Sequence, residues 1–311
     1  MAGSIYTVQE LMYALVTELE YPTWEELHCL DDLRADEQAE LLEFWSLVPQ
    51  ARRLRVAIAC QELAQDHLAF RGGALFRCLA NDADPQVRTA AMVGLGLDPD
   101  LASLEVLLAR AEVEIDDWVR LAAAETLGRF LLAGELKSWP KGMQTAAVAR
   151  LMDWSAEDAS ELVAVTLANL GFCGLEEVRA TLAANLLSDW EVRREAALVG
   201  IANSTDRSWE PVVLGIWRED PDLDVRAAAL RAAGRLGLQG FLDICLNVVE
   251  FEEEPKLRLG AIAALGDLGG AVAWRALAYA SESTDEEQRL AAEKALERLE
   301  SDTDPSGSIF S

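Results

Sequence analysis

Histidine is scarce in this chain of 311 residues, which has only His28 and His67. A metal site built on paired histidines therefore lacks ligands, and we expect no metal and no cofactor. A cysteine nucleophile would need one of these histidines beside it, whereas a cysteine inside an apolar helix is more often buried and inert. A glycine-rich phosphate loop is missing too. These shortages predict that the protein is not an enzyme.

Positive charge is also in short supply, with 27 Lys and Arg against 54 Asp and Glu and a net charge of −27. Nucleic-acid binding depends on neutralising phosphates with basic side chains. We therefore expect no nucleic-acid partner, and an anionic membrane surface is disfavoured for the same reason. The acidity indicates a solvated surface, and it favours a basic partner if one binds.

Five cysteines are scattered along the chain, and none of them forms a Cys-x-x-Cys pair. This pattern is typical of reduced thiols and predicts a cytoplasmic location. Residues 1–20 lack the basic segment of a signal peptide. No run of 18 apolar residues occurs, so we expect no membrane span.

The chain does contain an internal repeat with a period of about 32 residues. The repeated pattern is an acid, then Arg four residues later, Ala three residues after that, and Gly five further on. It occurs as Asp84…Arg88…Ala91…Gly96, Asp116…Arg120…Ala123…Gly128, Asp222…Arg226…Ala229…Gly234 and Glu254…Arg258…Ala261…Gly266. A period of this length indicates a solenoid built from similar units.

Each position of the repeat has a physical reason. The acid can cap a helix by accepting backbone N–H groups of its first turn. The expected caps are Asp84, Asp116, Asp189, Asp222, Glu254 and Asp285. Alanine on the apolar face lets helices approach closely, and the glycine suits a positive φ just past the helix end. Another apolar helix precedes each acid, so one unit is predicted to be a helical hairpin.

With its acid-x-x-[Val/Leu]-Arg-x-x-Ala pattern, the chain resembles HEAT repeats, specifically the short bacterial kind also called phycobilin-lyase-like, over residues 70–300. The resemblance implies an all-α solenoid, a right-handed superhelix of helical hairpins. It also implies that the anchor arginines form a ladder of salt bridges with acids of adjacent units. These arginines are Arg88, Arg120, Arg193, Arg226, Arg258 and Arg289. The alternative is that this row of arginines binds an anionic ligand.

Both ends of the chain depart from the repeat. Thr7…Glu10 and Thr23…Glu26 have the spacing of capping boxes and predict helix starts near residues 8 and 24. A third helix is expected over residues 37–47. We therefore divide the chain into an N-terminal helical cap (1–69), HEAT-like repeats (70–300) and a polar C-terminal tail (301–311).

HEAT arrays mostly serve as protein-binding scaffolds, so the resemblance favours a non-enzymatic scaffold or adaptor. Its partner would lie along the concave face that the second helices of the hairpins line. The alternative is a lyase or chaperone for a tetrapyrrole or another apolar ligand, as in phycobilin lyases. The two differ in the groove that they require, because a lyase needs a deep apolar groove and a scaffold a shallow charged face.

Two features are candidates for the binding surface. The step from Arg120 to Val163 is 43 residues, and we expect the extra residues to form a loop around Gly134–Gly142 that presents Lys137, Trp139 and Lys141. The second feature is a set of tryptophans near the starts of repeat units, Trp118, Trp154 and Trp190. They either bind a peptide along one edge or seal the core between units.

Overall fold

The structure is a computed structural model that describes residues 6–17, 21–66, 70–137, 140–157 and 160–303. For residues 135–137, 141, 160 and 301–303 it describes the backbone alone. The described residues form eighteen α-helices and three short 3-10 helices, without a strand. They divide into two compact units, Met1–Trp154 and Ser155–Ser311. The predicted all-α solenoid of helical hairpins is confirmed.

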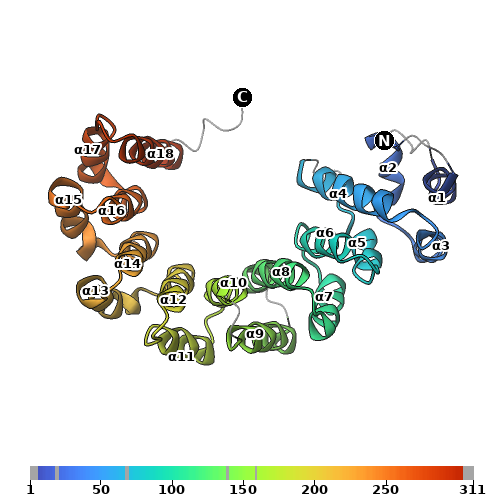
Figure 1. Cartoon of the computed structure of the whole chain (residues 1–311), viewed down its shortest axis with the longest axis horizontal. Coiled ribbons are helices and arrows are strands. Elements are labelled where there is room, and N and C mark those ends of the chain that lie inside the picture. The colour runs from blue at the N-terminus through green and yellow to red at the C-terminus, as the bar shows by residue number, and fades with distance from the viewer. Residues whose placement is uncertain (1–5, 18–20, 67–69, 138–139, 158–159, 304–311) are drawn as a thin grey trace. The chain divides into compact units, whose positions relative to one another are not determined.

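Unit 1 contains nine helices, of which α4, α6 and α8 pack side by side as one layer (Figure 1). Helices α5 and α7 pair with α6 and α8 and contact each other, so they form the second layer. The helices are α1 (Val8–Thr17), α2 (Trp24–Leu27), α3 (Ala35–Trp45), α4 (Gln50–Asp66), α5 (Gly73–Leu79), α6 (Pro85–Leu95), α7 (Leu101–Val113), α8 (Asp117–Lys137) and α9 (Lys141–Ser155).

Unit 2 repeats this arrangement with α10, α12, α14, α16 and α18 in one layer. Helices α11, α13, α15 and α17 each pair with the helix that follows (Figure 1). The helices are α10 (Ser160–Leu170), α11 (Glu176–Asn185), α12 (Glu191–Asn203), α13 (Glu210–Glu219), α14 (Leu223–Arg235), α15 (Leu242–Phe251), α16 (Pro255–Leu268), α17 (Gly270–Ala280) and α18 (Glu286–Thr303). Throughout the described residues, none of these helices is long and apolar enough to cross a membrane.

The helix starts predicted for the N-terminal region are confirmed. Helices α1 and α2 begin at Val8 and Trp24. The backbone N–H of Thr7 donates to Glu10 Oε2 at 2.8 Å, and that of Thr23 donates to Glu26 Oε2 at 2.6 Å. Helix α3 begins two residues earlier than expected, at Ala35. The division into cap, repeats and tail stays a prediction, and α1–α4 belong to the same compact unit as the hairpins after them.

Four of the six predicted helix caps are confirmed: the carboxylates of Asp84, Asp116, Asp222 and Asp285 accept backbone N–H groups of the following turn. Glu254 precedes α16 without a side-chain cap bond. At α12 the cap residue is Trp190, one residue after the predicted Asp189. The helix there therefore starts one residue later than the pattern suggests.

The repeated glycines have a different role from the predicted one. Gly96 has a φ of −82°, and the positive-φ glycines of the described residues are Gly72, Gly237, Gly269 and Gly270. Gly234 instead lies inside α14, where a Cβ atom would come within 2.6 Å of Ala264 Cα on α16. Small residues thus allow α14 and α16 to approach closely, as expected, and Gly234 is one of these residues. The predicted positive φ at this position is wrong, because α14 continues past it.

The extra residues between the units of Arg120 and Val163 lengthen helices, so the predicted long loop is wrong. Helix α8 runs for 21 residues, whereas α6 has 11. Lys137 ends α8 and Lys141 begins α9. Trp139 and the side chains of Lys137 and Lys141 lie outside the described residues.

Candidate functional site

A second acid, two residues before the acid that precedes the helix, supports several of the turns between hairpins. Its carboxylate accepts the backbone N–H of that later acid at distances of 2.8–3.3 Å. The pairs are Asp82 with Asp84, Glu114 with Asp116, Asp220 with Asp222 and Glu252 with Glu254. Our reading of the sequence missed this residue, although the acid-x-acid spacing at all four turns was a visible signal.

These second acids are the partners of arginines from the preceding hairpin. Arg53 Nε lies 2.9 Å from Asp82, Arg88 Nε 2.8 Å from Glu114 and Arg194 Nε 2.8 Å from Asp220. In each case the arginine is the fourth residue of its helix. Because α12 starts one residue late, the arginine at this position is Arg194. The prediction that Arg193 belongs to the ladder is therefore wrong.

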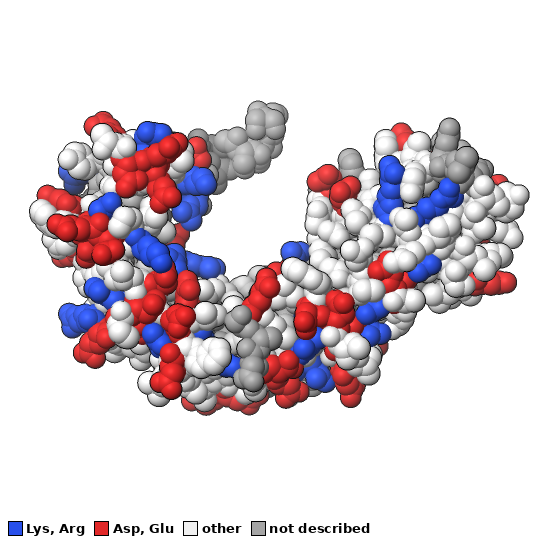
Figure 2. Space-filling view, in the orientation of Figure 1, with Lys and Arg blue, Asp and Glu red and all other residues white. Residues whose placement is uncertain are grey.

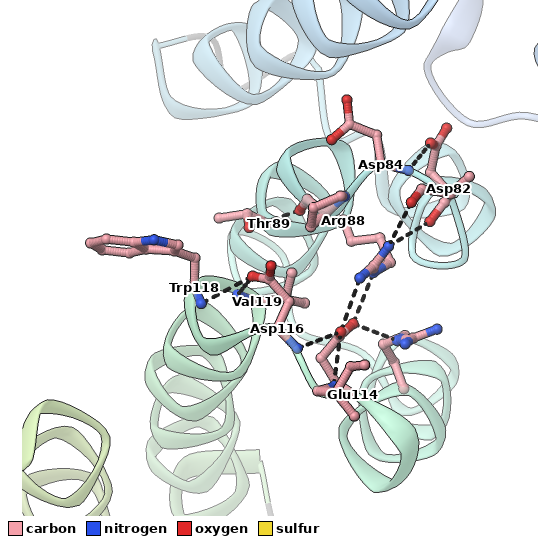
Figure 3. A network of polar contacts seen from close by, with 12 residues as sticks. Asp82, Asp84, Arg88, Thr89, Glu114, Asp116, Trp118 and Val119 are labelled. Atoms are coloured by element: carbon pink, nitrogen blue, oxygen red, sulfur yellow. Dashed lines mark hydrogen bonds and ion pairs between the residues drawn. The ribbon is translucent and has the colours of Figure 1, made fainter. Parts of the chain in front are cut away.

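The best-connected rung joins Arg88 and Glu114 (Figure 3). Arg88 donates to both carboxylate oxygens, at 2.8 and 2.9 Å, and to the backbone carbonyl of Asp82 at 2.9 Å. Arg110 donates to the same carboxylate at 2.8 Å. Burial raises the pKa of Glu114, but hydrogen bonds from Arg88 and the Asp116 N–H and the two guanidinium charges outweigh it, so its pKa falls to about 2. Arg88 therefore joins its own hairpin to the next one along the chain.

The other predicted anchors differ in their contacts. Arg258 Nη2 lies 3.4 Å from Asp285 of the next hairpin, as the ladder requires. Arg226 instead donates to the backbone carbonyl of Trp217 at 2.9 Å, and its guanidinium lies 4.8 Å from the ring centroid of Trp217.

The remaining predicted anchors contact neighbours on their own helix or backbone oxygens. Arg120 and Arg289 lie 3.8 Å from Asp117 and Glu293, respectively. Arg193 donates to the backbone carbonyls of Ser155 and Glu157. The ladder implied by the resemblance is thus correct at Arg88 and Arg258, whereas Arg193 and Arg226 donate to backbone carbonyls instead.

Two hollows flank the exposed face of α4 in unit 1 and share Ile58. The first, of about 760 Å³, lies between α2 and α4 and is lined by Tyr21, Trp24, Arg55, Ile58 and other residues. Arg55 lies over the Tyr21 ring at 3.7 Å from its centroid. Figure 2 shows Lys and Arg gathered over α2 and α4.

The second hollow, of about 720 Å³, runs along α4 from Gln50 to Gln61 and over the starts of α6 and α8. Leu54, Ile58 and Thr89 lie in it, and Trp118 forms its edge. Trp118 is 68% exposed, and its side chain projects from the start of α8 away from the Arg88 network (Figure 3). The spacing of Leu54, Ile58 and Gln61 on α4 puts these three side chains on one helical face.

The predicted tryptophans fall into two groups. Trp118 and Trp190 are exposed, at 68% and 60%. Trp154 is 3% exposed, with Arg120 5.5 Å from its ring centroid. Burial removes Trp154 from the candidate surface, because it packs in the core of its unit. Sequence reasoning missed Tyr21, Trp24 and Ile58, since they lie in the region that departs from the repeat.

The described part of the chain has few side chains suited to binding a metal ion or acting as a nucleophile. Among these residues no group of three or more His, Cys, Asp or Glu is placed to hold a metal ion. The five cysteines are free thiols. Burial raises the pKa of Cys245 to about 12 and raises that of Cys60 as well. Neither thiol would supply a thiolate near neutral pH.

The hairpins define an α-solenoid of two-helix units. Residues 210–297 match the family described as HEAT repeats. This match covers 88 of the 311 residues, and the helices outside it form hairpins of the same kind. Comparison of the sequence with curated proteins finds no match.

Two solved structures with TM-scores above 0.5 share this fold. A chain of the Kap95p–RanGDP structure is 17% identical with a TM-score of 0.54, over 93% of this chain and 46% of that one. A chain of the Kap95:Nup1 complex is also 17% identical, with a TM-score of 0.55 over 94% and 46%. This chain thus spans about half the length of those proteins. The CpcE–CpcF phycocyanin lyase complex from Nostoc sp. is 18% identical over 73% of this chain and 94% of that one, with a TM-score of 0.49.

Proposed function

We propose that the chain is a non-enzymatic scaffold that binds a protein partner across the two hollows beside α4. The observation that carries this proposal is the set of large apolar side chains left exposed around them. Trp24 is 54% exposed, Ile58 41% and Trp118 68%. Exposed aromatic and aliphatic side chains gathered around a concavity are the usual anchors of a protein interface.

The chemistry of the hollows favours a partner segment with apolar anchors flanked by basic residues. Glu62 and Asp66 line the first hollow, and Asp84 and Asp116 line the second. Arg55 is the basic residue of the first hollow, and it already lies against Tyr21. The net charge of −27 acts in the same direction, because it speeds encounter with a basic partner.

The alternative expected from the sequence, a lyase or chaperone for a tetrapyrrole or another apolar ligand, requires a deep apolar groove. Both hollows mix apolar residues with charged or amide side chains, such as Glu62 in the first and Gln50 and Gln61 in the second. This mixture supports protein binding. The thiols are free and are buried or partly buried, as is common in a reducing compartment. We therefore propose that the protein acts in the cytoplasm.

The test is a pull-down from the source organism with the wild-type chain as bait, followed by affinity measurement with the captured partner. Replacing Trp118 with Ala and Ile58 with Asp should weaken binding tenfold or more, because each would remove an anchor worth at least about 1–2 kcal/mol. Tyr279→Ala is the matched control, since Tyr279 is 77% exposed on α17 of unit 2. Undiminished binding by folded Trp118 and Ile58 variants would refute the proposed surface.

A further inference from the structure

A hollow of about 550 Å³ lies in unit 2 between α13 and the turn that follows α11 (Figure 1). Its lining combines apolar side chains with acidic ones. The apolar residues are Leu186, Leu187, Val212, Ile216 and Pro221, and the acids are Asp189, Glu219 and Asp220. None of these residues lines the two hollows beside α4. The hollow is therefore a second, separate concavity.

The turn between α11 and α12 departs from the acid-x-acid pattern of four other turns. Ser188 stands where the second acid would be, and its Oγ accepts the backbone N–H of Trp190 at 3.2 Å. Trp190 is the cap residue, although its side chain makes no cap hydrogen bond. Asp189, which the repeat pattern suggested as the cap, lines the hollow instead. Positions that break the local rules of a fold in this way are common at functional sites.

Large apolar side chains stay exposed around the same turn. Leu187 is 86% exposed, Trp190 60% and Val212 38%. Trp190 lines a further hollow of about 360 Å³, which shares Leu187, Ser188 and Asp189 with the first. The two hollows thus meet at the turn, and together they form the α13 groove. Exposed apolar side chains gathered around a concavity are typical of a protein interface.

The groove also contains a glycine that packing does not explain. Gly215 lies inside α13, where glycine is less favourable than alanine. At Gly200, Gly234 and Gly260 the reason is packing, since a Cβ atom would come within 2.4–2.9 Å of the backbone of a neighbouring helix. A Cβ atom at Gly215 would meet no other described part of the chain within 4 Å. Glycine at this position instead lets a ligand approach the helix backbone closely.

Negative charge predominates in the larger hollow, which has three carboxylates and one arginine. Arg194 lies 2.8 Å from Asp220, and the two side chains are only 11% and 4% exposed, so this pair is already matched. Asp189 and Glu219 are exposed. Arg193, which lines the smaller hollow, donates to two backbone carbonyls. The charge that the groove offers to a partner is therefore that of Asp189 and Glu219, which favours a basic segment.

We propose that the α13 groove docks a basic amphipathic helix of a partner protein. An apolar side chain of that helix would lie over Gly215 and against Leu187, and its lysines or arginines would lie beside Asp189 and Glu219. This inference rests on the proposed function in treating the chain as a protein-binding scaffold. It goes beyond that function because it assigns a second surface, in unit 2, and the chemistry of its ligand.

Fluorescence polarisation with the full chain at 0.15 M salt tests the groove with labelled synthetic peptides. The probe is an amphipathic peptide with leucines on one helical face and lysines on the other. In one control peptide glutamate replaces every lysine, and in another serine replaces every leucine. We expect saturable binding of the probe alone. With the probe bound, the backbone amides of residues 186–190 and 210–219 should exchange with solvent more slowly.

The sharpest variant is Gly215→Leu. It fills the groove and, because leucine is the better helix former, it should leave the chain at least as stable. Binding of the probe should weaken tenfold or more in this variant and in Trp190→Ala. Asp189→Asn should weaken it about threefold through the lost charge. The matched control is Asp243→Asn, an exposed aspartate on α15 outside the groove, and it should bind like the wild type.

Three results would overturn the inference. The first is the absence of saturable binding of the probe, and the second is undiminished binding by Gly215→Leu. The third is an equal loss in Asp189→Asn and Asp243→Asn, which would show a general effect of net charge. Trp118→Ala separates this inference from the proposed function. If that variant loses the probe and Gly215→Leu retains it, the peptide binds beside α4 and the α13 groove is refuted alone.

Discussion

Arg88 and Glu114 form a two-pronged ion pair that joins α6 to the turn before α8, with a Glu114 side chain that is 0% exposed. The pKa of Glu114 is about 2, below its usual value of 4.5. A lowered pKa stabilises the folded chain above about pH 4.5, and this contribution is lost as the pH falls to about 2.

We therefore predict that Glu114→Gln lowers the free energy of unfolding by about 3 kcal/mol at pH 7. The difference between wild type and variant should shrink between pH 4.5 and 2. Urea denaturation at pH 7, 4 and 3 measures this. A difference that stays constant over that range would show that the ionised carboxylate is not the source of the stability.

Arg88→Ala should cost more stability than Arg226→Ala. The first change leaves the buried Glu114 with one arginine instead of two, a loss of roughly 2–4 kcal/mol. Arg226 donates to the carbonyl of Trp217 and stacks on its ring, so its loss should cost about 1 kcal/mol. Thermal or urea denaturation of the two variants ranks them. The reverse order would show that Arg226 has a larger role in the ladder than its contacts indicate.

Gly234→Ala and Gly215→Ala should change stability in opposite directions. A Cβ at Gly234 would meet the backbone of α16 at 2.6 Å, so the helices would have to separate, at a cost of about 2 kcal/mol. Gly215 lies inside α13 with no atom within 4 Å of the added Cβ, so alanine should stabilise that helix by about 0.5–1 kcal/mol. Denaturant midpoints of both variants decide the matter. A stabilised Gly234→Ala protein would contradict the close approach of α14 and α16.

Thr205→Gly should raise the free energy of unfolding by about 1 kcal/mol, because glycine adopts a φ of +54° without steric cost. Thr205→Asn should give a smaller gain, since asparagine tolerates this region better than threonine. Differential scanning calorimetry of the three proteins provides the comparison. If both variants unfold at a lower temperature than wild type, the threonine side chain makes a stabilising contact that offsets the strain.

The local features of the repeat could be predicted because they depend on residues close in sequence. Asp84 caps its helix through a backbone N–H two residues away, and Thr7 and Glu10 form their capping box within one turn. The register of Arg194 could not be predicted in this way. It depends on α12 starting after Trp190, and the aspartate at 189 suggested an earlier start.

Features that depend on packing were harder to predict. Gly234 was assigned a turn conformation because glycine is common at helix ends, whereas its reason is the approach of α16. Trp118 and Trp154 look alike in sequence, yet one is exposed and the other buried. The hollow between α2 and α4 joins residues outside the repeat, such as Tyr21, to residues on α4. No spacing rule connects them.

The acid-x-acid turn makes the contacts of a hairpin with its two neighbours unequal. Glu114 braces the turn that starts its own hairpin's second helix, and it also neutralises an arginine of the hairpin before it. Removing the downstream hairpin would take away the carboxylate partner of Arg88, whereas removing the upstream one would leave Glu114 paired with Arg110 and still bracing its turn. Growth or loss of units is therefore unequal at the two sides of a hairpin. A chain shortened from its C-terminal side should lose stability faster than one shortened by the same unit from its N-terminal side.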